Sequence, residues 1–219
     1  MISAISLMRR RADIRLDAFR RHWIGVHGPL VCGFPGLRGY VQWHVIHAAP
    51  TNAPARRFGI DGFPILWFDD DAARVRAHAS PEMAACNVDS RGFIGAVSRV
   101  IAEPRVLVAP AAGARFGLIM LFPGAVPDDA RLHRYAETAL RLPGLAGLVL
   151  HQVREQGPAP NSTVPHLPVG VAGLAEVRFA TRAAVAAEEI GAACFLAEAH
   201  DLAPLAPVAP SAAPSSRNH

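Results

Sequence analysis

The sequence contains no lysine, so all 22 of its basic residues are arginines. Charged residues of both signs make up only 18% of the 219-residue chain, and aromatic residues only 7%. The formal net charge is +4, and the arginines do not gather on one stripe with interleaved aromatics. Nucleic-acid-binding proteins show such a basic, aromatic-rich stripe. The composition therefore predicts no nucleic-acid partner.

Cysteine is scarce: Cys32, Cys86 and Cys194 stand far apart, and none of them forms a CxxC pair. This spacing indicates neither a disulfide framework nor a zinc site, so we expect a cytoplasmic protein without a metal. Long apolar runs are also lacking. A membrane span needs about 18 apolar residues, and the longest candidate, residues 106–122, is interrupted by Arg115. We expect no membrane span, and no signal peptide, because the charges follow the apolar N-terminus instead of preceding it.

An internal repeat is the most informative feature that is present. Residues 34–41 (FPGLRGYV) reappear 108 positions later as residues 142–149 (LPGLAGLV). Each copy follows an apolar strand candidate and a helical stretch, and each is followed by two strands and a second helix. Because 51% of the chain is apolar, each half has enough material for a buried sheet face.

The expected elements come from apolar periodicity and capping residues. Strands are expected at residues 2–8, 39–46, 63–68, 97–101, 115–122, 148–153 and 175–179. The first helix is expected to begin at Asp17 and to bury Phe19, Trp23, Val26 and Leu30. Further helices are expected at 72–79 after a cap within 69–71, after Asp128 or Asp129 with Leu132, Tyr135 and Leu140 buried, and at 182–190 after Thr181.

This order predicts an α+β protein of two ferredoxin-like β-α-β-β-α-β halves. A single half leaves one apolar sheet face bare, so we expect the halves to pair as a dimeric α/β barrel with a pocket between the sheets. The expected domains are residues 1–105 and 114–200, followed by a disordered tail at 201–219 that is rich in Pro, Ala and Ser. Pairing could occur within one chain or between the chains of a homodimer.

The segment from Phe19 to Leu30 is chemically the richest. On the expected helix, His22 and His27 lie on opposite edges of the apolar face, with Trp23 between them. A partly desolvated histidine titrates near neutrality and suits general acid–base catalysis. A histidine at a helix end can equally cap carbonyl groups, so the spacing alone leaves both roles open.

The repeat adds an asymmetry between the two halves. In the second half, five residues are missing between the helix and the Pro-Gly-Leu turn, and nothing replaces His27. A histidine that is kept in one half and lost in the other favours a protein with a single site.

Five separated motifs resemble the EthD family of the dimeric α/β-barrel superfamily. They lie within the first 105 residues, at 19–30, 35–42, 61–68, 80–82 and 89–93. The resemblance implies a ferredoxin-like fold whose sheets pair into a barrel with an apolar pocket. It also implies that no cofactor is needed, since members are commonly cofactor-free.

The same resemblance suggests which residues form the site. It implies His27 and His22 as catalytic residues and the following as substrate-binding residues: Trp23, Tyr40, Gln42, Asp61, Trp67 and Asp89. On their strand Tyr40 and Gln42 share one face. Either aspartate could orient a histidine, although Asp89 is also placed as a helix or turn cap.

Two hypotheses for the function follow. The first is a small enzyme that acts on an apolar cyclic or aromatic-derived metabolite by isomerisation, dehydration, cyclisation or an oxidative degradation step. His27 would then move a proton. The alternative is a non-catalytic accessory protein that holds a hydrophobic small molecule for a partner oxygenase.

Overall fold

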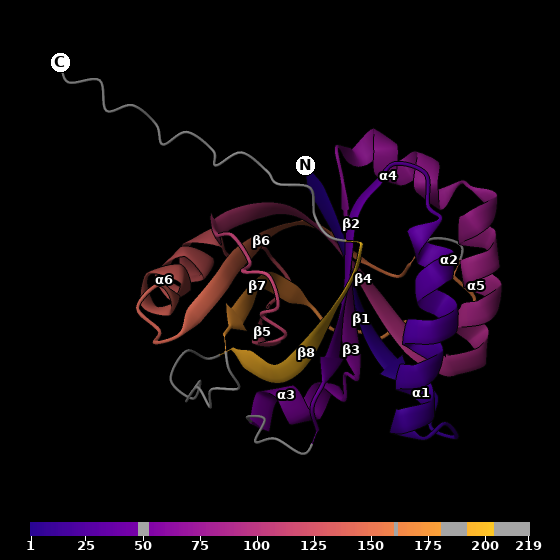
Figure 1. Ribbon diagram of the computed structural model, residues 1–219, viewed down its shortest axis with the longest axis horizontal. Helices are drawn as coiled ribbons and strands as arrows, with labels where there is room; N and C mark the ends of the chain where they lie inside the picture. The colour runs from indigo at the N-terminus through magenta and orange to yellow at the C-terminus, as the bar shows by residue number, and fades with distance from the viewer. Residues whose placement is uncertain (48–52, 160–161, 181–191, 204–219) are drawn as a thin grey trace.

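The centre of the molecule is a closed barrel of eight strands, and all neighbouring strands run antiparallel. The computed structural model describes residues 1–47, 53–159, 162–180 and 192–203. Around the barrel the strands follow in the order β1, β3, β2, β8, β5, β7, β6, β4 (Figure 1). They are β1 (Ile2–Arg10), β2 (Leu37–Val45), β3 (Gly62–Phe68), β4 (Ile94–Val108), β5 (Phe116–Pro123), β6 (Leu145–Gly157), β7 (Val171–Phe179) and β8 (Ala193–Ala203).

Helices cover the outside of the barrel on two sides. The helices are α1 (Leu16–His22), the π-helix η1 (Trp23–His27), α2 (Gly28–Cys32), α3 (Ala53–Phe58), α4 (Asp71–His78), α5 (Pro81–Phe93) and α6 (Asp129–Ala139). Helices α1, η1, α2, α4 and α5 lie over the strands of the first half, α6 lies over those of the second half, and α3 packs against β8 (Figure 1). None of the helices in the described residues is both long and apolar enough to cross a membrane.

The two halves of the chain contribute their strands in the same order. The first half supplies β4, β1, β3 and β2 as neighbours, and the second supplies β8, β5, β7 and β6. The halves join where β2 pairs with β8 and where β4 pairs with β6. The predicted α+β class and the barrel are confirmed. Closure takes place within one chain and pairs both edges of each four-stranded sheet, which would otherwise be open to association.

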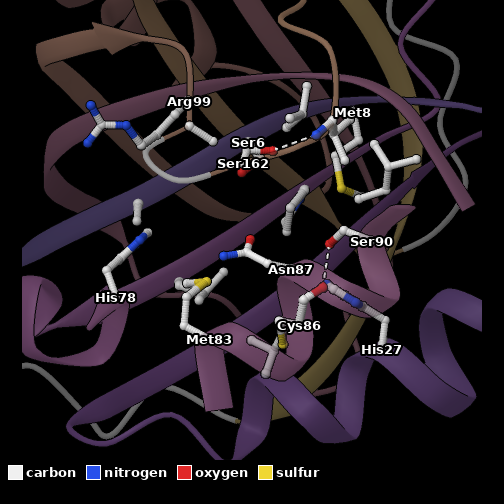
Figure 2. Close-up of a pocket in the computed structure, with 18 of the residues that line it drawn as sticks. Ser6, Met8, His27, His78, Met83, Cys86, Asn87, Ser90, Arg99 and Ser162 are labelled. Carbon is white, nitrogen blue, oxygen red and sulfur yellow. Dashed lines mark hydrogen bonds between the residues drawn. The ribbon is translucent and has the colours of Figure 1, made fainter. Parts of the chain in front are cut away.

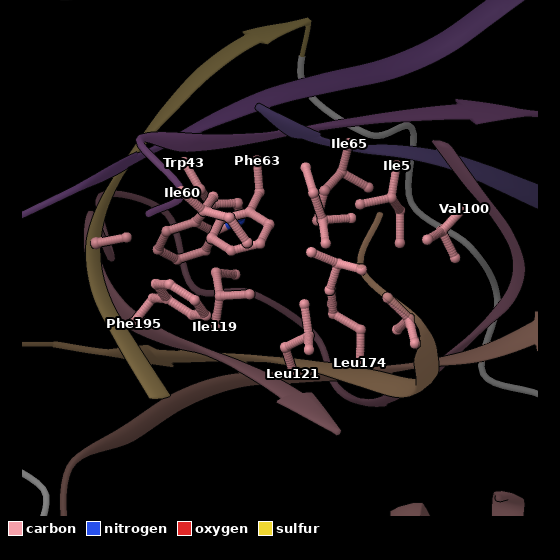
Figure 3. Close-up of a cluster of buried hydrophobic side chains, with 14 of the residues drawn as sticks. Ile5, Trp43, Ile60, Phe63, Ile65, Val100, Ile119, Leu121, Leu174 and Phe195 are labelled. Carbon is pink, nitrogen blue, oxygen red and sulfur yellow. The ribbon is translucent and has the colours of Figure 1, made fainter. Parts of the chain in front are cut away.

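The barrel interior is filled by side chains. Trp43, Phe63 and Phe195 pack at one end, and the rings of Phe63 and Phe195 meet edge to face at 5.0 Å (Figure 3). Eight strands enclose a space that side chains can just fill. The prediction of a pocket between the two sheets is therefore wrong, and the cavity described below lies outside the barrel.

One part of the barrel interior is polar and still buried. Arg178 donates from Nε to Glu176 Oε1 at 3.0 Å and from both terminal nitrogens to Asp201 at 2.9 Å. Its guanidinium also lies 5.0 Å from the ring centroid of Trp43. Glu176 is only 1% exposed and Arg178 4%. Buried charges are tolerated when they are paired in this way.

The first helical segment departs from regular α-helix. Residues 23–27 form a π-helical turn between α1 and α2. The wider turn shifts the side chains that follow it, so the buried positions fall at Phe19, Trp23 and His27. Val26, which α-helical periodicity places on the buried face, is 48% exposed. That part of the prediction is wrong because the sequence pattern assumed a uniform α-helix.

Helix starts agree with the sequence analysis in α4 and α6 but not in α1. Asp70 accepts a hydrogen bond from Ala73 N–H at the start of α4, and Asp128 caps α6. In α1 the N-cap is Arg15, and Asp17 lies inside the first turn. Leu140, expected on the buried face, follows the end of α6 and is 49% exposed.

Several elements differ from those expected. The sequence analysis predicted no helix at α5, although Ser80 followed by Pro81 is a typical helix start. The terminal strand of the second half was expected from the β-α-β-β-α-β order but was not located; it is β8 and includes residues 201–203, which were assigned to the disordered tail. The rest of that tail and the helix predicted at 182–190 lie outside the described residues.

Two buried histidines make stability depend on pH. Burial lowers the pKa of His151 to about 3, and burial, His200 and Arg20 lower the pKa of His44 to about 2. The unfolded chain therefore binds more protons than the native one below pH 6.5. As the pH is lowered below 6.5, the free energy of unfolding should fall by about 1.4 kcal/mol per pH unit for each such histidine.

Urea unfolding between pH 7 and pH 4.5 measures this slope. His151→Leu should make the slope shallower, whereas the same change at the exposed His166 should leave it as it is. An equal slope in the wild type and His151→Leu would contradict the lowered pKa of His151 in the folded protein.

Candidate active site

A single carboxylate holds both histidines of the first helical segment. Asp89 lies on α5, where its Oδ1 accepts from His22 Nε2 at 2.9 Å and its Oδ2 from His27 Nδ1 at 2.8 Å. The π-helical turn is what places the two histidines so that both reach one carboxylate. π-Bulges within helices occur frequently at functional sites. The aspartate thus orients the histidines and does not act as the cap that sequence reasoning also allowed.

The ring of Phe93 packs against both imidazoles. Its centroid lies 4.8 Å from that of His22 and 5.0 Å from that of His27. The side chain of His27 is 10% exposed, that of Asp89 16% and that of His22 34%. Exposure to solvent therefore decreases from His22 through Asp89 to His27.

Burial and the carboxylate act in opposite directions on His27. Burial lowers the pKa of His27 below its ordinary value of 6.5, and the hydrogen bond to Asp89 partly opposes this effect. His27 is therefore neutral at pH 7. Because the carboxylate accepts the Nδ1 proton, the lone pair stands on Nε2, which has no hydrogen-bonding partner within the described chain. A neutral imidazole oriented in this way can act as a base.

His27 lines a cavity of about 120 Å³ between the sheet of the first half, the helices outside it and the segment around Ser162 of the second half (Figure 2). The walls are largely apolar. They are formed by side chains of β1, β2, β3, β4, α2 and α5 that include Ile5, Met8, Val31, Tyr40, Leu66 and Met83. Besides His27 and Tyr40, a few polar side chains reach the cavity, namely Ser6, His78, Asn87, Ser90, Arg99 and Ser162. An apolar cavity with a few placed polar groups is typical of small-molecule sites.

A chain of hydrogen bonds runs along the outer face of β2. His44 Nε2 lies 3.0 Å from Gln42 Oε1, and Gln42 Nε2 donates to Tyr40 Oη at 2.8 Å and to the Trp23 carbonyl at 2.9 Å. Tyr40 lines the cavity, whereas Gln42 is fully buried behind it. Burial raises the pKa of Tyr40, so its hydroxyl stays protonated.

Not all predicted site residues come together. Trp23 does not line the cavity: its ring stacks on His44 at 4.3 Å and presses against Gly62, where an added Cβ would lie 2.2 Å from it. Trp67 points into the barrel interior. Asp61 binds His47 Nε2 at 2.9 Å and the Arg10 backbone N–H. None of the three lines the cavity, and we place none of them in the substrate site.

Sequence reasoning missed the remaining polar residues of the cavity. His78 ends α4, Arg99 lies on β4, and Asn87 and Ser90 lie on the unpredicted helix α5. A cap signal at Ser80 would have shown the helix, but no local pattern shows which strand residues face it. Within the described residues no group of three or more His, Cys, Asp or Glu side chains is placed to hold a metal ion.

Comparison with known families bears on the part of the chain that forms this site. Residues 11–96 match the family model described as the EthD domain. This part of the chain is therefore similar to the EthD domain. Both histidines and Asp89 lie inside the matched range, whereas Arg99 and the other cavity residues before 11 and after 96 lie outside it. No curated protein matches the chain.

Several solved structures are similar to this chain. An EthD family protein from Bacillus halodurans is 23% identical, covering 47% of this chain and 97% of its own, with a TM-score of 0.39. An anthrone oxidase-like protein is 9% identical over 95% of this chain and 96% of its own, with a TM-score of 0.61. A protein from Fusobacterium nucleatum described as a candidate monooxygenase is 9% identical over 92% of each chain, with a TM-score of 0.53. At these identities the last two show a shared fold and nothing more.

Proposed function

We propose that this protein is a small enzyme in which His27 transfers a proton on an apolar cyclic metabolite held in the cavity. The observation that supports it is the pair Asp89–His27 on the cavity wall. The carboxylate accepts a hydrogen bond from Nδ1 of the imidazole, which leaves Nε2 available to a substrate. A base that is oriented by a carboxylate and sheltered from water is a recurrent arrangement in acid–base catalysis.

The proton would move in two steps. Nε2 of His27 takes a proton from a substrate carbon, and the imidazolium that forms is stabilised by the adjacent Asp89 carboxylate. The imidazolium then returns the proton at another position, which completes an isomerisation or supports a dehydration or cyclisation. Because the chain contains no lysine, a Schiff base with a lysine side chain takes no part.

His22 has a positioning role in this proposal. It does not line the cavity, and it holds the second oxygen of Asp89 from the more exposed side. We likewise propose that each half of the barrel is a ferredoxin-like unit, with domains at residues 1–105 and 114–200. The common strand order supports the ferredoxin-like halves. His27, which the second half lacks, lines this cavity, and that agrees with a single site.

Turnover on a panel of five- and six-membered unsaturated lactones and cyclic enones tests the proposal. Double-bond migration is followed by absorbance, and deuterium uptake from D₂O by NMR. Deuterium uptake above the buffer rate is the expected result. Binding of panel members without any exchange would instead favour the accessory protein that holds a ligand for a partner oxygenase.

The pH dependence of kcat/KM gives a further prediction. The neutral form of His27 is the active one, so kcat/KM should be level near pH 7 and fall at acidic pH, below 6.5, where His27 takes up a proton. Asp89→Asn removes an interaction that raises this pKa and should move the fall to lower pH. A fall that stays at the same pH in Asp89→Asn would contradict the role of the pair.

A further inference from the structure

We infer that Arg99 selects the substrate: the cavity takes a molecule of a single ring whose carbonyl oxygen accepts a hydrogen bond from the Arg99 guanidinium. The inference rests on the proposed function in that it concerns the same cavity. It describes binding, however, and can be tested without turnover.

The first observation is that Arg99 is buried and that its hydrogen-bond donors are only partly satisfied. It lies on β4 with its side chain 9% exposed, and it lines the cavity at the end away from His27 (Figure 2). Its Nη2 donates to Glu155, while Nε is buried without a partner within the described residues. A buried donor without an acceptor is costly, and native structures usually satisfy such groups. An oxygen on the bound molecule would satisfy this one.

The charges around Arg99 determine whether a neutral carbonyl or a carboxylate binds there. Glu155 balances Arg99, and Asp71 binds Arg74 at 2.7 Å. Burial, Arg74 and Arg99 lower the pKa of His78 to about 4, so His78 is neutral at pH 7. This end of the cavity thus carries donors without net positive charge. A neutral carbonyl gains a hydrogen bond there, whereas a carboxylate would lose its hydration without a free counter-charge.

The volume of the cavity decides the size of the molecule. An apolar cavity of about 150 Å³ in another protein holds one benzene ring, and this one measures about 120 Å³. It therefore holds one small ring, and a system of two or three fused rings exceeds it. Apolar walls at Leu66 and Met83 suit the ring, and the two polar ends suit its substituents.

Binding of three small probes tests the oxygen. Cyclohexanone, methylcyclohexane and cyclohexanecarboxylate are compared by ligand-observed NMR with the full chain. The wild type should bind the ketone more tightly than the hydrocarbon by about tenfold to a hundredfold, the range for a hydrogen bond to a charged group. It should also prefer the ketone to the carboxylate. A wild type that binds the carboxylate or hydrocarbon best would overturn the inference.

Variants of Arg99 assign the preference to this side chain. Arg99→Met should remove the preference for the ketone and leave methylcyclohexane binding unchanged. Arg99→Met combined with Glu155→Met removes the donor and its counter-charge together, and it serves if Arg99→Met does not fold. Arg154→Met, which changes a half-exposed arginine paired with Glu103, is the matched control. A ketone preference that persists in Arg99→Met or in the double variant would contradict the role of Arg99.

A variant of Glu155, the counter-ion of Arg99, and a comparison of ketones with one and two rings complete the test. Glu155→Gln leaves the Arg99 charge unbalanced and should raise carboxylate affinity about tenfold or more. The two-ring ketone 1-tetralone should bind more weakly than cyclohexanone, and tighter binding would overturn the size limit. If ketone selectivity is found but no panel member exchanges deuterium, the proposed function fails and the inference stands. Deuterium exchange without any ketone selectivity would support the proposed function and overturn the inference about Arg99.

Discussion

Replacing His27 with Gln is expected to lower kcat by roughly 10²- to 10⁴-fold, the range in which general acid–base catalysis contributes. The amide of Gln fits the same space but cannot take up a proton at neutral pH. Ligand affinity and the urea midpoint should change little, because the contacts of the cavity walls remain. Turnover of the unsaturated lactone or enone that the wild type uses fastest is the measurement.

The controls separate catalysis from packing. His27→Ala removes the ring as well and should lose both rate and some stability, since His27 is buried beside Phe93. His133→Gln changes a histidine on α6 of the second half, outside the cavity, and should keep full activity. His22→Gln should have a smaller effect than His27→Gln, because His22 acts only through Asp89. Unaltered turnover in both His27 variants would rule out the proton-transfer role.

Replacing Arg178 with Met is expected to destabilise the protein by about 3–5 kcal/mol, the usual cost when one partner of a buried ion pair is lost. The change leaves Glu176, which is 1% exposed, without its cation. It also removes the stacking on Trp43 and the link to Asp201 on β8. Urea unfolding monitored by tryptophan fluorescence and circular dichroism gives the free energy.

A double variant tests whether the loss comes from an uncompensated charge. Arg178→Met combined with Glu176→Leu should be more stable than Arg178→Met alone, because no buried carboxylate then remains unpaired. The exposed pair of Arg154 and Glu103 is the comparison, and Arg154→Met should cost about 0–1 kcal/mol. Equal losses at Arg178 and Arg154 would show that burial of the pair contributes nothing.

The sequence analysis succeeded where a local pattern carries the information. The strands were found because β-branched and aromatic runs are bounded by glycine and polar residues, as around 62–68. Helix starts were found where a short polar side chain caps the chain, as at Asp70 and Asp128. The histidines stood out because His22 and His27 flank an otherwise apolar helix face.

It failed where the spacing changes or where the partner is distant in sequence. The π-helical turn breaks the 3.6-residue period on which the burial of Val26 was predicted. Trp67 and Asp61 belong to a recognisable motif, but one faces the barrel and the other binds His47. A motif shows which residues occur together, whereas strand pleating and pairing decide which way each of them points.

By itself the sequence determined the class of the fold and the chemistry available to it. Local propensity and apolar periodicity act over a few residues, so they set seven of the eight strands, the helices α4 and α6 and the histidine-rich helix. Only the tertiary structure decided that Asp89, 62 positions after His27, holds that histidine, and that Arg99 shares its cavity. It also decided that the barrel closes within one chain and buries Arg178 with Glu176. Such contacts depend on how strands and helices pack in three dimensions, and no short stretch of sequence records that packing.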